Sequence, residues 1–476
     1  MDVPAPADPY IENRVFDQIA PGDSASIVRT LTREDIELFA LVSGDVNPAH
    51  LDPAYAETDL FHHVIAHGLW GGALISAVLG TKLPGPGTIY LSQDLRFQAP
   101  VGIGDTVTTS VTVRTMKPER HRIVFDCRCV NQAGTAVITG TAEVQAPTAK
   151  VRRRRVELPD IRFNRHERFR ELLARTSGLL ALPMAVAHPC DAASLGAAVE
   201  VAELGLVAPI LVGPAARIMD TAKDAGLDIS RFRLVDAPHS HAAAACAVAL
   251  VRAGEAALLM KGSLHTDELM HAVLASGTGL RTERRLSHVY IMDVPSYPRP
   301  LLLTDAVVNI EPSLEDKRDI VQNAIDLAHI LGITAPRVAI LAAVETVNPA
   351  MRSTLDAAAL CKMADRGQIT GGLVDGPLAF DNAVSLEAAR QKGIVSPVAE
   401  QADILVVPDL EAGNMLAKQL SFLAGADAAG VVAGARVPII LTSRADSERT
   451  RIASCAVAVL MARAHATALG AAPEHG

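Results

Sequence analysis

The chain has 476 residues, of which 49% are hydrophobic and 20% are charged, and its formal net charge is −9. This length predicts about two to four domains, and the hydrophobic content excludes a disordered chain. The acidic balance argues against binding of nucleic acid, which needs a basic face. No uncharged apolar run reaches the roughly 18 residues of a membrane span, so we expect no membrane partner.

The cysteines and the first residues of the chain indicate its compartment. None of the six cysteines belongs to a Cys-x-x-Cys pair, and a chain of this size needs no disulfide framework, so reduced thiols are expected. Residues 1–10 have neither the basic nor the apolar segment of a secretion signal. These features predict a cytoplasmic protein.

The first 150 residues change from a helical pattern to a strand pattern. Thr32–Ser43 has helical spacing, and Thr32 forms a predicted capping box with Asp35. Gly68–Gly80 is apolar on nearly all sides, which predicts a buried helix. Alternating apolar and polar residues then predict three strands, at residues 106–116, 121–130 and 135–145. We expect an α+β domain over residues 1–150, with an antiparallel sheet wrapped around one helix.

The remaining residues predict a linker and a second domain. Residues 151–165 lack periodicity and contain the run Arg152–Arg155, which is typical of a solvated linker. From 166 to 476, short apolar segments alternate with helical patterns, which predicts an α/β, doubly wound, mostly parallel sheet. The predicted strands lie at residues 184–187, 209–212, 257–260, 289–292, 338–341, 404–407 and 438–441.

The segment SGDVNPAH, residues 43–50, carries chemistry in the first domain. Its Asn-Pro turn can aim the carboxylate of Asp45 and the imidazole of His50 into one cleft. One such group can take a proton from water while the other manages the proton at the neighbouring carbon, as addition or removal of water requires. Gly68 opens the buried helix, where free N–H groups can hold a negative oxygen. Taken alone, the segment is equally compatible with a turn that carries an incidental histidine.

Three histidines of the first domain, His62, His63 and His67, resemble a metal-binding cluster in composition. Adjacent histidines do not usually share one ion, and no pattern of carboxylates or cysteines accompanies these three. We therefore interpret them as a packed segment that leads into the helix, and we expect no metal.

Residues 30–145 resemble the MaoC-like, (R)-specific enoyl-CoA hydratase family, which has the hotdog fold. The matching segments are SGDVNPAHLDPAYA, FHHVIAHGLWGGALISAVLG and IYLSQDLRFQAPVGIGD. The resemblance implies that Asp45 and His50 are the catalytic pair and that the Gly68 N–H binds the thioester carbonyl. It also matches two further polar residues to the family. Asn47 corresponds to the asparagine of the motif, and Ser76 to a polar position near the acyl pocket.

The segment LTSRADS, residues 441–447, stands out in the second domain, because it follows a predicted strand and precedes a predicted helix. Hydroxyls, a guanidinium and free helix N–H groups at the carboxyl edge of a sheet predict an oxyanion or phosphate site. The alternative is a helix cap without a ligand. Neither the dinucleotide fingerprint G-x-G-x-x-G nor the P-loop is present in the sequence.

Residues 180–470 resemble the phosphate acetyl/butyryltransferase family. The matching segments are LMKGSLHTDELM, RLSHVYIMDVP, DGPLAFDNAVS, PDLEAGNMLAKQL and VPIILTSRADS. The resemblance implies that Ser443 and Arg444, beside Thr442, handle the acyl carbonyl and the phosphate. It also implies four further substrate-binding residues. Two of them, Asn414 and Lys418, line the same cleft, and two are candidate phosphate clamps, Arg284 and Arg285.

One position departs from the transferase family. Acetyl-specific members carry an Asp seven positions after the serine, as the base for the CoA thiol, and this chain has Thr450 there. Asp446 is the nearby carboxylate that can take this role, or the base lies elsewhere.

Together the two halves predict a bifunctional acyl-CoA enzyme. One half hydrates a trans-2-enoyl-CoA to an (R)-3-hydroxyacyl-CoA, or runs the reverse, and the other exchanges an acyl group between CoA and phosphate. We expect no cofactor beyond these substrates, and a homo-oligomer by analogy with paired hotdog domains. Two alternatives stay open: a hydratase whose second half only binds acyl-CoA and oligomerises, and a transferase whose first half only binds CoA.

Overall fold

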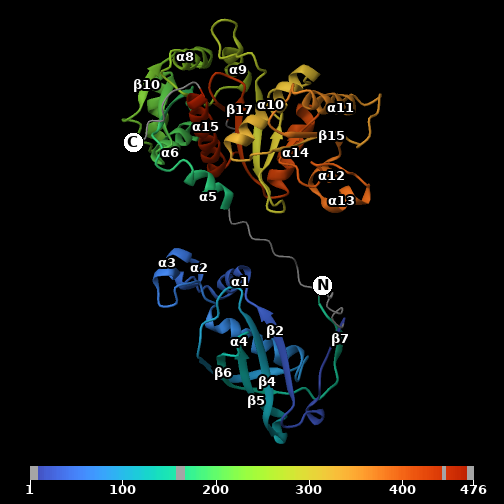
Figure 1. Ribbon diagram of the computed structural model, residues 1–476. Helices are drawn as coiled ribbons and strands as arrows, with labels where there is room; N and C mark the ends of the chain where they lie inside the picture. Colours follow the sequence, from blue (N-terminus) through green and yellow to red (C-terminus); the bar gives the residue numbers. More distant parts are fainter. Residues whose placement is uncertain (1–8, 157–166, 442–445, 469–476) are drawn as a thin grey trace. The chain divides into compact units, whose positions relative to one another are not determined.

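The computed structural model describes residues 9–156, 167–441 and 446–468 of the chain. The chain divides into two compact units, Met1–Phe163 and Asn164–Gly476, and each unit is described by itself (Figure 1). Among the helices within these described ranges, none has the length and apolarity needed to cross a lipid bilayer.

The first unit contains the predicted antiparallel sheet. Five strands pair in the order β2-β4-β5-β6-β3, and every neighbouring pair is antiparallel. The strands are β2 (Ser24–Thr30), β3 (Ile89–Phe97), β4 (Thr106–Lys117), β5 (Arg122–Val130) and β6 (Ala136–Gln145). The helices are α1 (Arg33–Ser43), α2 (Pro48–Leu51), α3 (Pro53–Thr58) and α4 (Gly68–Thr81). The hotdog arrangement expected from the sequence is confirmed.

Helix α4 packs on this sheet with one face only. Its buried residues, which include Trp70, Ile75, Val78 and Leu79, join the alternate residues of β4 and β5 in one apolar core. The opposite face is exposed, and the Leu69 side chain has 55% of its surface accessible. The expectation of a helix buried on all sides was therefore wrong, because one sheet can cover only one side of a helix.

Helix α1 begins as the sequence predicts. The Thr32 side chain accepts a hydrogen bond from the Asp35 N–H, and the Asp35 carboxylate accepts one from the Thr32 N–H. This reciprocal pair satisfies two of the N–H groups that a helix start leaves unpaired. Its last turn ends at Gly44 with φ 74°, a conformation that favours glycine. The chain then turns into the segment that carries Asp45.

The arginine run is not simply a linker. Arg152–Arg154 form strand β7, which pairs antiparallel with β1 (Tyr10–Glu12), near the start of the unit's sequence. The Arg152 guanidinium lies 4.4 Å from the centroid of the Tyr10 ring, a favourable cation–π contact. A run of identical residues has no apolar alternation, so its pairing is invisible in the sequence. The predicted linker 151–165 therefore starts too early, and its residues 157–165 lie outside the described part of the chain.

The second unit is built on an eleven-stranded sheet in the order β10-β9-β8-β11-β18-β17-β12-β13-β16-β14-β15. Each of the seven predicted strands is present, and four others carried too weak a pattern to be predicted: β10, β13, β15 and β17. The bounds are β8 (Leu182–Ala187), β9 (Val207–Gly213), β10 (Arg233–Asp236), β11 (Leu258–Lys261), β12 (Ser287–Asp293), β13 (Leu301–Thr304), β14 (Arg337–Leu341), β15 (Leu373–Leu378), β16 (Ile404–Val406), β17 (Asp427–Ala433) and β18 (Ile439–Ile440).

Helices cover both faces of this sheet, so the doubly wound arrangement is confirmed (Figure 1). One face is covered by α6, α10, α11 and α15, and the other by α8, α9 and α12–α14. The bounds are α5 (Glu167–Ala174), α6 (Ala192–Glu203), α7 (Ala215–Ala225), α8 (Ser240–Arg252), α9 (Thr266–Leu274), α10 (Leu314–Ile330), α11 (Arg352–Asp365), α12 (Phe380–Val384), α13 (Leu386–Gln391), α14 (Leu410–Phe422) and α15 (Glu448–Ala468).

The strands of this sheet run in two opposite groups. Strands β8–β11 and β18 are parallel to one another, and β12 shares their direction because β17 is antiparallel to both β18 and β12. Strands β13, β16, β14 and β15 run the other way. We call the edge where β8, β11, β12 and β18 end the first edge, and the opposite one the second edge. Residues that follow strands of different groups therefore lie at different edges.

Candidate active sites

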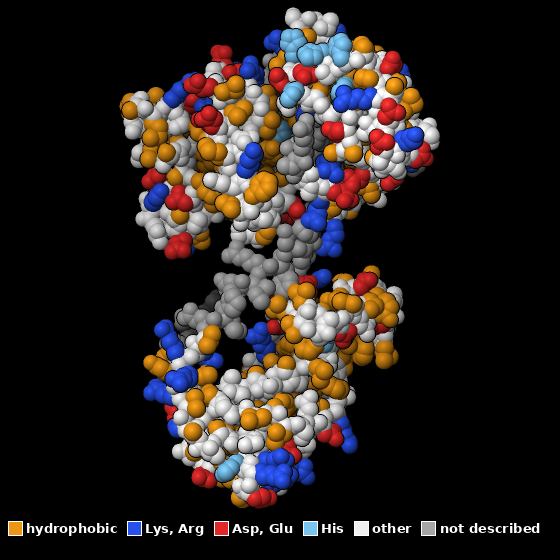
Figure 2. Space-filling model, turned by 180° about the vertical axis from the view of Figure 1, so that it is seen from behind, with side chains coloured by type: hydrophobic (Ala, Val, Ile, Leu, Met, Phe, Trp, Pro, Cys, Tyr) orange, Lys and Arg blue, Asp and Glu red, His pale blue; other side chains and the backbone are white. Residues whose placement is uncertain are grey.

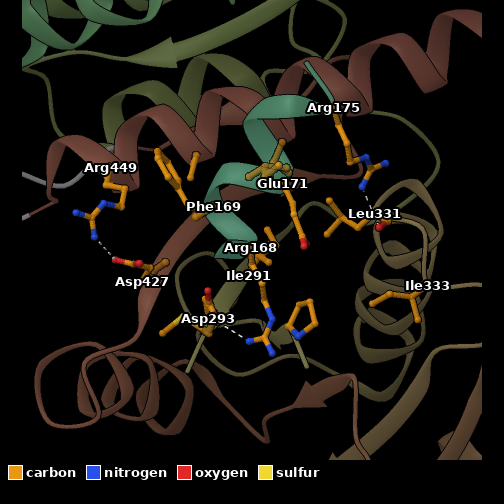
Figure 3. A pocket seen from close by; sticks show the side chains of 17 residues that line it. Arg168, Phe169, Glu171, Arg175, Ile291, Asp293, Leu331, Ile333, Asp427 and Arg449 are labelled. Atoms are coloured by element: carbon orange, nitrogen blue, oxygen red, sulfur yellow. Dashed lines mark hydrogen bonds and ion pairs between the residues drawn. The ribbon is translucent and has the colours of Figure 1, made fainter. Parts of the chain in front are cut away.

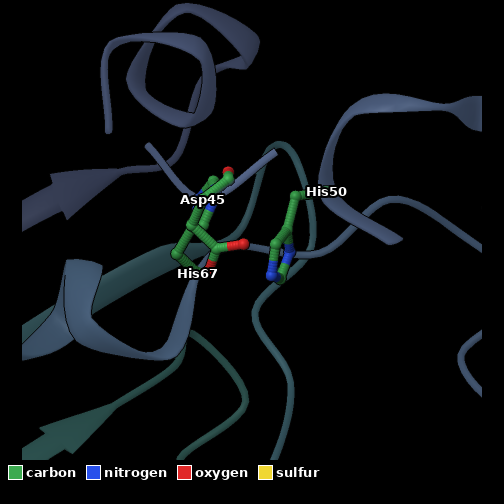
Figure 4. Close-up of side chains that lie close together, drawn as sticks. All are labelled: Asp45, His50 and His67. Atoms are coloured by element: carbon green, nitrogen blue, oxygen red, sulfur yellow. The ribbon is translucent and has the colours of Figure 1, made fainter. Parts of the chain in front are cut away.

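Asp45, His50 and His67 meet in the first unit. A carboxylate oxygen of Asp45 and one ring nitrogen of each histidine lie within 4.8 Å of one another (Figure 4). The predicted Asn-Pro turn brings Asp45 and His50 together as the sequence suggested. The Asn47 side-chain oxygen accepts a hydrogen bond from the Ala49 N–H at 3.1 Å and caps α2, which carries His50. Asn47 thus shapes the turn.

A backbone carbonyl fixes the orientation of the His50 ring. The Nδ1 atom of His50 lies 2.9 Å from the carbonyl oxygen of Ile65. A carbonyl oxygen can only accept, so Nδ1 carries the hydrogen and donates it. The Nε2 atom of His50 is then the lone-pair nitrogen, which can accept a proton from a bound water. This tautomer suits a general base in its neutral form.

A cavity of about 280 Å³ adjoins the histidines. Its walls are largely apolar, and His50, His67 and Gly68 line it as well. The remaining lining residues are Phe61, Ile65, Ala66, Trp70, Gly71, Phe97, Gln98, Ala99, Pro100, Val101, Val107, Cys129, Val137 and Ile138. This composition suits an apolar acyl group whose reactive end meets the histidines. Ser76, predicted near the acyl pocket, is exposed on α4 and does not line the described cavity.

Gly68 is the first residue of α4, as expected for an oxyanion-binding N–H. The helix cap, His67, makes no side-chain capping bond to the first turn, so N–H groups there remain available to a ligand. A Cβ atom on Gly68 would lie 3.2 Å from the Phe97 ring, which also lines the cavity. Glycine therefore lets a substrate oxygen approach this helix end closely.

The histidine cluster differs from the one considered in the sequence. His67 joins Asp45 and His50, and neither His62 nor His63 takes part in this group within the described residues. Two imidazoles and one carboxylate could hold a divalent ion. The sequence groups His67 with its chain neighbours His62 and His63, whereas the fold places it beside Asp45 and His50.

The predicted phosphate segment of the second unit follows β18 at the first edge. Residues 442–445 lie outside the described residues, so the roles of Thr442, Ser443 and Arg444 stay predictions. The neighbouring strand β11 pairs Met260 with Ile440, which sets Lys261 beside Leu441. Lys261, the last residue of β11, therefore lies near the start of the predicted phosphate segment. Ligands of α/β sheets bind beyond the carboxyl ends of strands.

Two more polar residues lie at the first edge. His188 follows β8, and its Nδ1 atom lies 3.3 Å from the hydroxyl of Ser263, which follows β11. Burial lowers the pKa of His188, and the positive charge of Arg217 acts in the same direction. Lys261 and Ser263 belong to the segment LMKGSLHTDELM, and neither residue was predicted to have a role. Residues 442–447 were chosen because they are polar and directly follow a predicted strand. The same criterion would have selected Lys261 and Ser263.

Asp446 is half-buried, and its carboxylate influences Tyr290 on β12. Burial raises the pKa of Tyr290 to about 12, and the negative charges of Asp446 and Asp305 add to the rise. Thr450 lies in the first turn of α15, where its N–H donates to the Ser447 hydroxyl at 3.1 Å. The Ser447 hydroxyl therefore caps the helix start at which Thr450 lies, and Asp446 remains the candidate base.

The second unit contains four further predicted binding residues, Arg284, Arg285, Asn414 and Lys418. Arg284 and Arg285 precede β12 and so lie at the second edge, where Arg284 pairs with Asp326 and Arg285 with Asp316. Asn414 donates to the carbonyl oxygen of Ala306, which follows β13 at that same edge. The exposed Lys418 lies one turn farther along α14. The sequence does not show that β13 and β16 reverse direction. Because residues 442–445 lie outside the described part of the chain, the cleft predicted for Asn414 and Lys418 and the phosphate-clamp role of the two arginines stay predictions.

Another cavity, of about 220 Å³, opens between α5, α15 and the first edge (Figure 3). Its walls are mostly apolar, and its rim is charged. The Arg449 guanidinium lies 3.2 Å from the Asp427 carboxylate, and Arg168 pairs with Asp293. These carboxylates neutralise the arginines at the rim. None of the binding residues predicted from the sequence lines this cavity within the described part of the chain.

Glu200 of α6 faces the first turns of α15, just after the predicted phosphate segment. Burial, together with the neighbouring carboxylate of Glu448, raises the pKa of Glu200 to about 7. An unfolded glutamate titrates at about 4.3, so the folded state binds a proton that the unfolded state releases first. Stability from this group is therefore present at acidic pH and lost as the pH rises through about 7.

We expect Glu200→Gln to raise Tm relative to the parent protein, with a difference that grows from pH 5 to pH 8 to about 2 °C or more. Calorimetry of both proteins at four pH values measures this. Glu203→Gln, which changes an exposed carboxylate of the same helix, is the matched control and should show a flat difference. Parallel Tm curves for the Glu200 variant and its parent would contradict the assignment.

Comparison with known proteins gives a match for each unit. The family model for phosphate acetyl/butaryl transferases matches residues 239–459, and the model for MaoC-like domains matches residues 20–131. The phosphate acetyltransferase of Rhizobium meliloti is 69% identical over 277 residues, which cover 58% of this chain and 88% of that protein.

Two solved structures extend these matches. A branched-chain phosphotransacylase from Enterococcus faecalis is 30% identical, with a TM-score of 0.53, and the match covers 59% of this chain and 99% of that one. The R-hydratase PhaJ1 from Pseudomonas aeruginosa is 44% identical, with a TM-score of 0.32, and covers 33% of this chain and 99% of that one.

Proposed function

The chain belongs to the phosphate acetyl/butyryltransferase family and carries a MaoC-like domain ahead of it, and on this premise we propose that it catalyses two reactions of acyl-CoA thioesters. The first unit adds water reversibly to a trans-2-enoyl-CoA and forms an (R)-3-hydroxyacyl-CoA. The second unit exchanges an acyl group between CoA and phosphate. The observation that carries the proposal for the first unit is the meeting of Asp45 and His50 beside an apolar cavity.

The hydration follows from the site geometry. A water molecule between the Asp45 carboxylate and His50 Nε2 can give a proton to one of them as its oxygen bonds to C3 of the enoyl group. A proton passes to C2, so the pair ends in the protonation state in which it began. The negative charge that develops on the thioester oxygen meets the N–H of Gly68 at the helix start. The acyl chain occupies the apolar cavity.

The transfer reaction uses the first edge of the second unit. A phosphate oxygen attacks the thioester carbonyl carbon, the C–S bond breaks, and the CoA sulfur leaves and takes a proton. Lys261 lies where it can balance the charge of the phosphate, and we assign Ser443 and Arg444 to the same step on the basis of the family motif. Asp446 is our candidate to exchange the proton with the CoA thiol. A non-catalytic second half is not favoured, because the relative that is 69% identical is a phosphate acetyltransferase.

We also propose that neither reaction uses a resident metal, although Asp45, His50 and His67 could hold one. General acid–base chemistry by Asp45 and His50 accounts for hydration without an ion. Dialysis against EDTA should therefore leave the hydration rate within about two-fold of its starting value, a change far smaller than the loss expected on removal of an essential metal. A spectrophotometric assay of enoyl-CoA consumption before and after dialysis measures this. Loss of activity that Zn²⁺ or Fe²⁺ restores would contradict the proposal.

We propose further that the protein forms a homo-oligomer in the cytoplasm. Figure 2 shows hydrophobic side chains on the surface of the first unit near α1–α3. The exposed apolar residues in this part of the chain include Leu41, Val42, Val46 and Leu60, and those on α4 and β3 include Leu69, Ile89, Leu91 and Phe97. An apolar surface of this kind supports association with another copy. The six cysteines are free thiols, which supports a reducing compartment.

A further inference from the structure

We infer that His67 is a positioning residue of the hydratase site, which holds Asp45 and His50 in register with the N–H of Gly68. This inference rests on the proposed hydration and adds a residue to which the sequence patterns assigned no part in it. His67 is buried, with 3% of its surface accessible, and it borders the cavity together with His50 and Gly68.

A hydrogen bond connects His67 to the turn that carries Asp45. The Nε2 atom of His67 lies 2.9 Å from the backbone carbonyl oxygen of Asp45. That oxygen can only accept, so Nε2 carries the hydrogen and donates it. The other ring nitrogen, Nδ1, is buried and has no hydrogen-bond partner among the described residues. Within the described residues, the His67 side chain therefore makes its polar contact through Nε2, to the carbonyl oxygen of Asp45.

The His67 ring also forms part of an aromatic stack. Its centroid lies 4.0 Å from that of His50, at an interplanar angle of 36°. The Phe39 ring of α1 lies 5.0 Å from the His67 centroid, at 34°. Contacts with both rings limit rotation of the imidazole, which keeps Nε2 aimed at the Asp45 carbonyl. They also give the His50 ring a packed surface behind its proton-accepting nitrogen.

The backbone of His67 completes the link. His67 is the cap residue of α4, and Gly68 is the first residue of that helix. One residue thus touches the acid–base turn through its Nε2 atom, the second catalytic group through its ring, and the oxyanion-binding helix end through its own peptide bond. The distance between the water-binding groups and the thioester oxygen depends on this residue, and misplacement by 1 Å can cost about 10² in rate.

This role can be separated from a purely structural one, because Asp45 is exposed. If the donor of His67 is removed, water can hydrate the Asp45 carbonyl oxygen, so the loss of this hydrogen bond alone should cost little folding stability. The position of the turn should suffer instead. A positioning role therefore predicts a fall in kcat with little change in KM, and rescue by a side chain that restores the donor.

The experiment compares His67→Phe, His67→Asn and His67→Gln in the full chain. Phenylalanine keeps a ring without a donor, asparagine places its donor near Nδ1, and glutamine places one near Nε2. We expect kcat for hydration to fall about 10- to 10²-fold in the Phe and Asn variants, with KM within about three-fold. We expect the Gln variant to stay within about five-fold of the parent. His63→Phe, outside the cavity lining, is the matched control, and transferase activity of the same preparations checks that the chain is intact.

A double-mutant cycle tests whether His67 acts through Asp45. In an Asp45→Asn background, His67→Phe should lower the remaining rate by less than about three-fold, because the group it positions is already impaired. If the Phe variant does not fold, the Asn and Gln variants carry the same comparison. Parent-like hydration in the Asn variant, or equal losses in the Asn and Gln variants, would overturn the inference. Absence of hydration in the parent protein would instead overturn the proposed function.

Discussion

Replacement of Asp45 by Asn, or of His50 by Gln, is expected to lower kcat for hydration of crotonyl-CoA by about 10²-fold or more. Each change keeps the size of the side chain and removes a group that exchanges a proton with the bound water. His50 Nε2 is the lone-pair nitrogen because Nδ1 donates to the Ile65 carbonyl. Asp45 is exposed, so its change should leave Tm nearly unaltered. A spectrophotometric hydration assay with each purified variant measures the effect.

The matched control for this pair is Asp126→Asn. Asp126 lies on β5 in the same unit and pairs with Arg114 at 3.5 Å, with 58% of each side chain accessible. This variant should hydrate crotonyl-CoA at the parent rate. Phosphate-dependent CoA release by the same preparations should be unchanged. Wild-type hydration by either Asp45→Asn or His50→Gln would remove these residues from the mechanism.

Lys261→Ala is expected to lower phosphate-dependent CoA release by about 10²-fold while hydration continues at the parent rate. Lys261 ends β11 beside Leu441, from which the chain enters the predicted phosphate segment. Its Nζ donates to the carbonyl oxygens of Gly262 and Leu264 at 3.4 and 3.3 Å, which aims the ammonium group at this edge. Loss of the charge should weaken both phosphate binding and the transfer step. Release of CoA from acetyl- or butyryl-CoA at several phosphate concentrations measures it.

Lys362→Ala provides the matched control for Lys261. Lys362 is an exposed residue of α11 that pairs with Asp365 at 2.6 Å, and its loss should leave both activities unchanged. Arg444→Ala should resemble Lys261→Ala, because a guanidinium offers paired donors to a phosphate. Undiminished transfer in the Lys261 variant would place the phosphate site away from the first edge.

Local sequence patterns predicted most of the fold. The capping box of Thr32 and Asp35, the alternation in β4–β6 and the apolar strands of the second unit depend on neighbouring residues, so the chain itself displays them. Strands β10 and β15 are only partly buried, so their apolar pattern is weak. The pairing of β7 with β1 joins residues more than a hundred positions apart, and no local pattern reports it.

The candidate sites also contain some residues that the sequence predicts and others that only the fold brings together. Asp45 and His50 lie five positions apart, and one turn brings them together. His67 joins them from another segment, and the fold alone reveals that contact. In the second unit, Arg284 and Arg285 suited a phosphate by charge, but strand direction placed them at the second edge beside carboxylates. The sequence shows the charge of a residue directly. The edge of the sheet at which that residue lies depends on the pairing of distant strands, which the sequence does not show.

One preparation of the full chain, assayed for both activities, tests the central claim most directly. The protein should hydrate crotonyl-CoA, and it should release CoA from acetyl-, butyryl- or 3-hydroxybutyryl-CoA only when phosphate is present. Asp45→Asn should lower the first activity alone, and Lys261→Ala the second alone, each by about 10²-fold. A parent protein that hydrates crotonyl-CoA but releases no CoA with phosphate from any of these thioesters would contradict a bifunctional enzyme.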